Sequence, residues 1–140
     1  MKIVVVNGPN LNMLGKRNKD HYGSLTLEDI NRLILQKYPK IDFEFFQSNH
    51  EGVLIDYIQN VDADGLLINA GAYTHTSIAI RDALEILSIP KVEVHLSDIT
   101  NRESFRNINY IKDVVDFTFF GKKELSYLEG IHFLVEKKNN

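Results

Sequence analysis

Short apolar runs alternate with amphipathic stretches along this chain, and that alternation constrains its fold more than any other feature. Lys2–Asn7 contains four consecutive aliphatic residues, which is typical of a strand buried on both faces. Strands are predicted at residues 2–7, 41–47, 65–69, 91–96 and 115–120, and helices at 26–38, 52–61, 76–87 and 124–136. Because strands that alternate with helices of this size pair in parallel, we expect an α/β fold with a doubly wound five-stranded sheet in three layers. A single domain, residues 1–140, accounts for this pattern.

Turn and cap residues agree with these boundaries. Thr26 is predicted to cap the first helix, and Pro39 follows its end. Pro90 precedes the fourth strand. The polar residues 137–140 are expected to form a frayed tail.

The composition excludes several classes of function. The chain has no cysteine, so disulfide scaffolds, thiolate metal sites and cysteine nucleophiles are ruled out. The net charge of −3 is spread along the chain, which argues against a nucleic-acid partner. No apolar run is long enough to span a bilayer, and Met1 leads directly into a strand without a secretory signal. We therefore expect a cytoplasmic protein with no membrane partner.

The segment after the first strand, residues 8–25, is the strongest interruption of the pattern. Loops between a strand and a helix usually have about 2–6 residues, and much longer ones tend to be functional. This loop carries Asn10, Arg17 and Tyr22, and its glycines match neither a Walker A loop nor a dinucleotide fingerprint. Because ligands bind beyond the carboxyl ends of parallel strands, the loop is a candidate part of a ligand site. The alternative is an insertion without function.

Three more interruptions fall at the same predicted edge. Asn69 ends the third strand, and His75 is predicted to start the next helix, where the helix dipole favours the neutral imidazole. Glu93 and His95 lie two residues apart and face the same side of the fourth strand. A structural ion pair is the alternative for that pair, and a cap or turn role is the alternative for His75.

Arg102 and Arg106 form the third of these interruptions. At a spacing of four they are predicted to share one helical face at the rim, where they could hold an anionic or hydroxylated ligand. A solvated surface pair is the alternative.

These groups favour one kind of chemistry. The histidines are scattered without metal-ligand spacing, no GxSxG elbow is present, and no lysine lies inside an apolar strand. A guanidinium beside a phenol favours the phenolate, so Tyr22 with Arg17 could act as a base. His95 supported by Glu93 could act as an acid. Together they suit proton abstraction beside a carbonyl followed by loss of a leaving group.

Four segments in order resemble the type II 3-dehydroquinate dehydratases, also called type II dehydroquinases. The segments are NGPNLNMLGKR with HYG, SNHEGVLID, INAGAYTHTSIAIRDAL and VEVHLSDITNRESFR, and the resemblance covers nearly the whole chain. It implies a flavodoxin-like fold and dehydration of the small molecule 3-dehydroquinate to 3-dehydroshikimate in the shikimate pathway. It also implies anti elimination through an enolate, with no cofactor, no metal and no covalent imine.

The resemblance implies a role for each matching residue. Tyr22 would remove a C2 proton, with Arg17 holding it as phenolate, and Asn10 would position a water at the enolate oxygen. His95, oriented by Glu93, would protonate the departing C1 hydroxyl. The implied substrate contacts are Asn69, His75, Arg106, Leu96 and Ser97, with Arg102 in support. Asp82 would reach a neighbouring subunit's site in a homododecamer built from trimers.

The chain departs from the family pattern in places. Asn18 and Lys19 stand where members often carry Glu-Pro, which suggests a looser lid because proline restricts loop entropy. Residues 107–109 replace the usual His-Ser-containing sequence, a change expected to affect oligomer contacts and the lid more than the reaction.

Two alternatives to this enzyme remain. One is a flavodoxin-like binding module for FMN or a phosphoacceptor, although its phosphate loop or acidic cluster is missing. The other is a non-catalytic homologue, which would have no need of Tyr22, Arg17 and His95 together.

Overall fold

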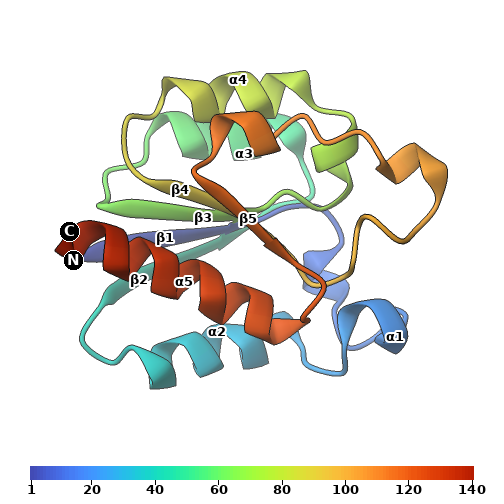
Figure 1. Ribbon diagram of the computed structural model, residues 1–140, viewed down its shortest axis with the longest axis horizontal. Helices are drawn as coiled ribbons and strands as arrows, with labels where there is room; N and C mark the ends of the chain where they lie inside the picture. Colours follow the sequence, from blue (N-terminus) through green and yellow to red (C-terminus); the bar gives the residue numbers. More distant parts are fainter.

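Five parallel strands form the middle layer of the protein, as a computed structural model of residues 1–140 shows (Figure 1). Their order across the sheet is β2-β1-β3-β4-β5. The bounds are β1 Lys2–Asn7, β2 Asp42–Gln47, β3 Gly65–Asn69, β4 Lys91–His95 and β5 Phe117–Phe120. The predicted doubly wound, five-stranded sheet is therefore confirmed, and its order reverses direction between β1 and β3.

The helices divide between the two faces of the sheet. The main ones are α2 Leu27–Lys37, α3 Glu51–Gln59, α4 Ile78–Ile86 and α5 Glu124–Asn139. In Figure 1, α3 and α4 cover one face, while α2 and α5 cover the other. Two separate apolar clusters lie between the sheet and these helix layers, because successive strand residues point to opposite faces. None of the helices combines the length and the hydrophobicity that a membrane span requires.

Short helical segments fill the connections. They are η1 Leu11–Met13, α1 Lys19–Tyr22, η2 Gly71–His75, η3 Ser104–Arg106 and η4 Lys112–Val114. The long segment after β1 is therefore structured, with η1 and α1 inside it. The carboxyl end of the chain also differs from expectation, because α5 continues to Asn139 where a frayed tail was predicted.

Local signals explain why α2 begins where it does. The Thr26 side chain accepts from the Asp29 backbone N–H at 3.1 Å, and Asp29 accepts from the Thr26 N–H at 3.0 Å. This reciprocal capping box satisfies two of the helix's otherwise unpaired N–H groups. The predicted cap at Thr26 is confirmed.

Close packing of α5 on the sheet depends on a glycine. A Cβ atom built on Gly130 would lie 2.9 Å from Val94 Cγ2 and 3.0 Å from Leu67 Cδ1. Gly52, on the exposed side of α3, has nothing within 4 Å of such an atom. The same substitution should therefore have opposite effects at the two positions.

We predict that Gly130→Ala lowers the free energy of unfolding by about 1 kcal/mol, because overpacking of about 1–3 kcal/mol exceeds the gain of up to ~1 kcal/mol in helix propensity. Gly52→Ala, which gains propensity without a clash, should raise stability by a few tenths to about 1 kcal/mol. Urea denaturation of both variants measures the difference. A stabilised Gly130→Ala variant would contradict the packing argument.

Candidate active site

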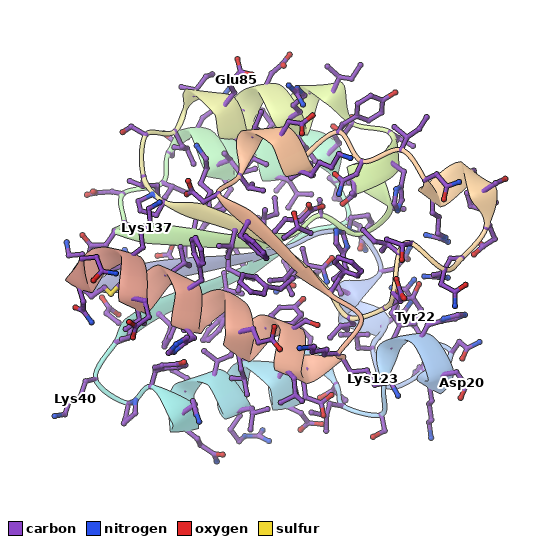
Figure 2. The ribbon with its side chains drawn as sticks, in the orientation of Figure 1. Asp20, Tyr22, Lys40, Glu85, Lys123 and Lys137 are labelled. Carbon is purple, nitrogen blue, oxygen red and sulfur yellow. The ribbon has the colours of Figure 1, made fainter.

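A polar cleft opens where β1, β3 and β4 reach their carboxyl ends. Ten residues singled out in the sequence line it: Asn10, Arg17, Tyr22, Asn69, His75, His95, Leu96, Ser97, Arg102 and Arg106. Five further lining residues had not been named individually as site candidates, namely Pro9, Leu11, Gly71, Ala72 and Ile99. Figure 2 shows Tyr22, the last residue of α1, at this edge of the molecule. The four interruptions in the sequence thus contribute to one site.

Two guanidinium groups hold the hydroxyl of Tyr22. Arg17 Nη2 donates to Tyr22 Oη at 2.8 Å, and Arg102 Nη1 donates to the same oxygen at 2.6 Å. The Arg17 guanidinium also lies 3.7 Å from the centre of the Tyr22 ring. Negative charge on this oxygen would therefore meet two positively charged donors, which strengthens both hydrogen bonds.

Three cations crowd this part of the cleft. Burial lowers the pKa of the Arg17 guanidinium, Tyr22 raises it, and the positive charges of Arg102 and Arg106 lower it again. The exposed carboxylate of Glu103 lies beside Arg102 and Arg106 but outside the cleft lining. The interior of the cleft is consequently positive and suited to an anion.

The arrangement of the two arginines differs from the sequence prediction. Arg102 precedes η3 and Arg106 ends it, so the pair does not share a helical face. Both side chains nevertheless line the cleft, because the segment after β4 curves around its rim. A 3-10 segment of three residues cannot provide the i, i+4 stacking that an α-helix would.

Tyr22 lies in a short turn, residues 18–23, which we call the lid turn and which is capped at both ends. The Asn18 side chain accepts from the Asp20 N–H at 2.9 Å, and the Gly23 N–H donates to the Lys19 carbonyl at 2.9 Å. Asn18 therefore supplies an N-cap at a position where members often carry Glu-Pro. The looser lid inferred from the missing proline stays a prediction.

On β4, Glu93 supports His95 from inside the sheet. His95 Nε2 lies 2.6 Å from Glu93 Oε2, and the carboxylate is fully buried. Burial raises the pKa of Glu93, but hydrogen bonding and charge from His95, together with bonds from Asn109 and Thr118, bring it below its usual value. An ionised Glu93 requires a proton on His95 Nε2, which leaves Nδ1 as the ring nitrogen free for other partners.

His75 occupies a different position from the one predicted. It ends η2 rather than starting a helix, and α4 begins only at Ile78. Burial lowers the pKa of His75, while its bond to the Ile108 carbonyl opposes that shift. The expected neutral imidazole is thus supported, but by desolvation rather than by a helix dipole.

The contact with Ile108 also fixes the His75 tautomer. The distance from His75 Nδ1 to the Ile108 carbonyl oxygen is 2.7 Å. Because a carbonyl only accepts, Nδ1 carries the proton and Nε2 is free to accept.

A buried relay sets the orientation of the Asn69 amide. The Gly71 N–H donates to Asn69 Oδ1 at 3.0 Å, so Nδ2 faces the other way and donates to Tyr127 Oη at 2.9 Å. Tyr127 in turn donates to Asn7 Oδ1 at 2.5 Å. One N–H of Asn69 Nδ2 remains available for a ligand.

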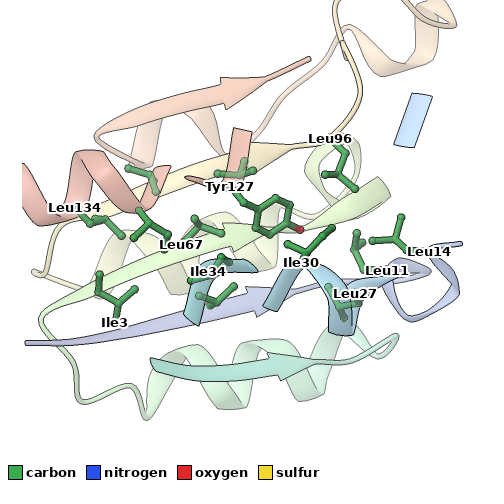
Figure 3. Close-up of a cluster of buried hydrophobic side chains, with 14 residues drawn as sticks. Ile3, Leu11, Leu14, Leu27, Ile30, Ile34, Leu67, Leu96, Tyr127 and Leu134 are labelled. Carbon is green, nitrogen blue, oxygen red and sulfur yellow. The ribbon is translucent and has the colours of Figure 1, made fainter. Parts of the chain in front are cut away.

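Tyr127 makes this connection from deep inside the protein. Figure 3 shows it among the aliphatic side chains of the cluster between the sheet and helices α2 and α5. It is fully buried, and burial raises the pKa of its phenol, so the hydroxyl stays protonated. A helix from the far end of the sequence therefore fixes a side chain of the cleft.

The loops after β1 and β3 pack backbone against backbone beneath the cleft. The Gly8 N–H donates to the Asn69 carbonyl at 2.8 Å, and a Cβ atom on Gly8 would lie 2.5 Å from the Ala70 carbonyl oxygen. Asn10 follows in a left-handed conformation with φ 68°, which asparagine tolerates better than most residues. This approach of the two loops places Asn10 and Asn69 in one cleft.

Asp82 is the one predicted site residue that lies apart from the cleft and its supports. It is exposed on α4 and does not line the cleft. No group of three histidine, aspartate or glutamate side chains is arranged to hold a metal ion.

Ionisable side chains that converge in one cleft, at the carboxyl edge of a parallel sheet, are typical of an active site. The fold and the cleft together therefore define an α/β enzyme. The sequence matches the family model described as "Dehydroquinase class II" over residues 1–135. The chain belongs to the class II dehydroquinase family.

Individual relatives agree with this assignment. A protein named 3-dehydroquinate dehydratase from Thermotoga maritima is 49% identical over 139 residues, which cover 98% of this chain and 96% of that protein. A protein of the same name from Geotalea daltonii is 53% identical over 135 residues, covering 94% of each.

Solved structures show the same fold. The type II dehydroquinase crystal structure from Butyrivibrio crossotus superposes with a TM-score of 0.92 at 46% identity, covering 96% of this chain and 97% of that chain. That from Propionibacterium acnes gives 0.88 at 33% identity, with 96% of each covered. The predicted family, fold and hydro-lyase enzyme class are confirmed.

We predict that Tyr127→Phe lowers the free energy of unfolding by about 1–3 kcal/mol, because it leaves Asn7 Oδ1 and Asn69 Nδ2 without their buried partner while preserving the packed volume. Tyr38→Phe, at the half-buried edge of the same cluster, is the matched control and should change stability little. Chemical denaturation compares the two. Equal stability of both variants would show that the hydrogen bonds of Tyr127 to Asn7 and Asn69 do not contribute to the free energy of unfolding.

Proposed function

We propose that this chain dehydrates 3-dehydroquinate to 3-dehydroshikimate, a step of the shikimate pathway toward chorismate and the aromatic amino acids. Family membership supports the overall reaction. The observation that carries the residue assignment is the pair of guanidiniums on Tyr22 Oη, at 2.8 and 2.6 Å, in the same cleft as the Glu93–His95 pair. The whole chain, residues 1–140, would act as one catalytic domain.

In the first step, the Tyr22 phenolate removes the C2 proton beside the C3 carbonyl. The electron pair of the broken C–H bond moves into an enolate. Arg17 and Arg102 hold the phenolate before the transfer, and the water positioned by Asn10 donates to the enolate oxygen. Donors placed where charge develops lower the barrier without further reorganisation.

In the second step, the enolate collapses and expels the C1 hydroxyl. His95 donates the proton on its Nδ1 to that oxygen, so the group leaves as water and the product enone forms. Throughout both steps, Glu93 accepts a hydrogen bond from the Nε2–H of His95 and keeps the ring oriented. A proton must then pass from Tyr22 to His95 before the next turnover, because one has gained the proton that the other lost.

The remaining side chains of the cleft bind the substrate. Asn69 offers its free N–H, and His75 offers Nε2 as an acceptor to a ring hydroxyl. Arg106 contributes positive charge, and the Leu96 and Ser97 backbone with the Ser97 hydroxyl receive the carboxylate. The positive interior of the cleft supports this placement of an anionic substrate.

We further propose that the enzyme is cytoplasmic, requires no cofactor or metal, and assembles as a homododecamer built from four trimers. The exposure of Asp82 on α4, away from its own cleft, supports a role at a neighbouring subunit's site. A closed symmetric assembly would repeat that contact at every site.

Purified protein should convert 3-dehydroquinate to an enone that absorbs in the ultraviolet. Tyr22→Phe should reduce kcat by about 10²–10⁴-fold or more, because it removes the general base, while leaving substrate binding by calorimetry largely intact. Tyr38→Phe serves as the control and should keep normal turnover. Near-normal kcat in Tyr22→Phe would show that the base is misassigned.

Activity should also survive EDTA, and it should survive borohydride added with substrate, since neither a metal nor a lysine imine takes part. Borohydride inactivation would refute the imine-free route, and EDTA inactivation would refute metal independence. Complete absence of turnover would instead overturn the assignment of the reaction.

Mixing two inactive variants tests the shared site. Tyr22→Phe and Asp82→Ala subunits, dissociated and reassembled together, should regain activity, because some sites then combine an intact Tyr22 with a neighbour's intact Asp82. Each variant reassembled alone is the control. Retained full activity of Asp82→Ala alone, or no recovery on mixing, would contradict the shared site.

A further inference from the structure

Glu93 has more hydrogen-bond partners than its role beside His95 explains. Thr118 Oγ1 donates to Glu93 Oε1 at 2.8 Å, and Asn109 Nδ2 lies 3.0 Å from both carboxylate oxygens. Thr118 stands opposite Glu93 in the register of β4 with β5. Asn109 comes from the segment between η3 and η4, so two separate elements reach the same buried carboxylate.

The polarity of Asn109 is fixed independently of Glu93. Asn109 Oδ1 accepts from the backbone N–H groups of Ile111 at 2.8 Å and Lys112 at 3.0 Å. Because those groups can only donate, the oxygen must face them and the Nδ2 group must face Glu93. Asn109 therefore presents a donor, which favours the ionised carboxylate over the protonated one.

The peptide groups on either side of Asn109 are anchored as well. His75 Nδ1 donates to the Ile108 carbonyl at 2.7 Å, and the Tyr110 N–H donates to the Thr74 carbonyl at 3.0 Å. Arg81 Nη1 donates to the Tyr110 carbonyl at 2.8 Å. Asn109 consequently cannot turn away from Glu93 without breaking several bonds.

We infer that Asn109 and Thr118 are positioning residues that hold Glu93 as an ionised, oriented acceptor behind His95 during catalysis. This inference rests on the proposed function of His95 as the acid. It assigns a role to part of the segment at residues 107–109, where the sequence departs from the family's usual pattern. Whereas that departure is expected to affect oligomer contacts and the lid more than the reaction, Asn109 contacts the supporting carboxylate directly.

The charged surroundings of Glu93 set the sign of the expected effect. His95 faces it from β4, and His75 from η2 interacts with both Glu93 and Arg106 of η3. β5 contributes only the neutral hydroxyl of Thr118. The pKa of Glu93 lies below its usual value with these donors present, so removing one should raise that pKa and cause activity to fail at higher pH on the acid side.

Asn109→Asp is the sharpest variant because it keeps the side chain's shape and the acceptor for the Ile111 and Lys112 N–H groups. It replaces the donor facing Glu93 with a second carboxylate oxygen. The acid limb of the pH profile of kcat/KM should move up by about 1 pH unit or more. Thr118→Val should move it in the same direction by less.

Asn107→Asp introduces the same charge change at an exposed neighbouring position and is the matched control. Its acid limb should coincide with that of the unmodified enzyme. If Asn109→Asp gave an unshifted limb, or only lower thermal stability with the limb unchanged, the positioning role would be overturned. An equal shift in Asn107→Asp would also overturn it, because general charge would then explain the result.

Carbon NMR of the Glu93 carboxyl, in protein labelled at the glutamate side-chain carboxyl, separates this inference from the proposed function. The signal is assigned by its loss in Glu93→Gln, and it is followed against pH without substrate. It should titrate at higher pH in Asn109→Asp than in the unmodified protein or in Asn107→Asp.

If turnover of 3-dehydroquinate failed but this shift appeared, the positioning of Glu93 by Asn109 would stand and the proposed reaction would not. An unchanged titration in an active enzyme would refute the hold on Glu93.

Discussion

The buried carboxylate of Glu93 is the constraint on which the rest of the site depends. An isolated ionised carboxylate in an apolar interior costs several kcal/mol, so it must be paired and fully hydrogen-bonded. His95, Asn109 and Thr118 meet that requirement from β4, the segment after η3, and β5. Satisfying one carboxylate thus fixes the tautomer of His95, the register of an edge strand and the path of the chain around the cleft.

The Tyr22 side of the cleft is positively charged, in contrast to the buried negative charge of Glu93 behind His95. Arg17 and Arg102 donate to Tyr22, Arg106 lines the same cleft, and no acid is among the lining residues. A parallel sheet makes this division possible, because all its strands deliver their carboxyl ends to one edge. In the proposed mechanism, the lid turn supplies one proton-transfer group and the end of β4 supplies the other, so both elements are needed for the elimination.

Much of this organisation could be predicted from the sequence because it rests on local patterns. Apolar runs predicted the strands. Polar residues at the strand ends and in the loops after them predicted eight lining residues of the cleft, and the family resemblance added Leu96 and Ser97. Contacts distant in sequence were missed. Nothing near Tyr127 indicates that its hydroxyl joins Asn7 to Asn69, and Arg102 was assigned only a supporting role although it donates directly to Tyr22. The spacing of Arg102 and Arg106 predicted a shared helical face, which was wrong because the chain there forms only a short 3-10 turn.

The stereochemistry of proton loss tests the central claim most directly, namely that a lid base and a strand-end acid act on two different groups of one substrate. 3-Dehydroquinate carrying deuterium at one C2 position in known configuration, converted by the enzyme and examined by mass spectrometry, shows which hydrogen departs. The account predicts loss of the hydrogen anti to the C1 hydroxyl and retention of the other. Loss of the syn hydrogen would contradict it.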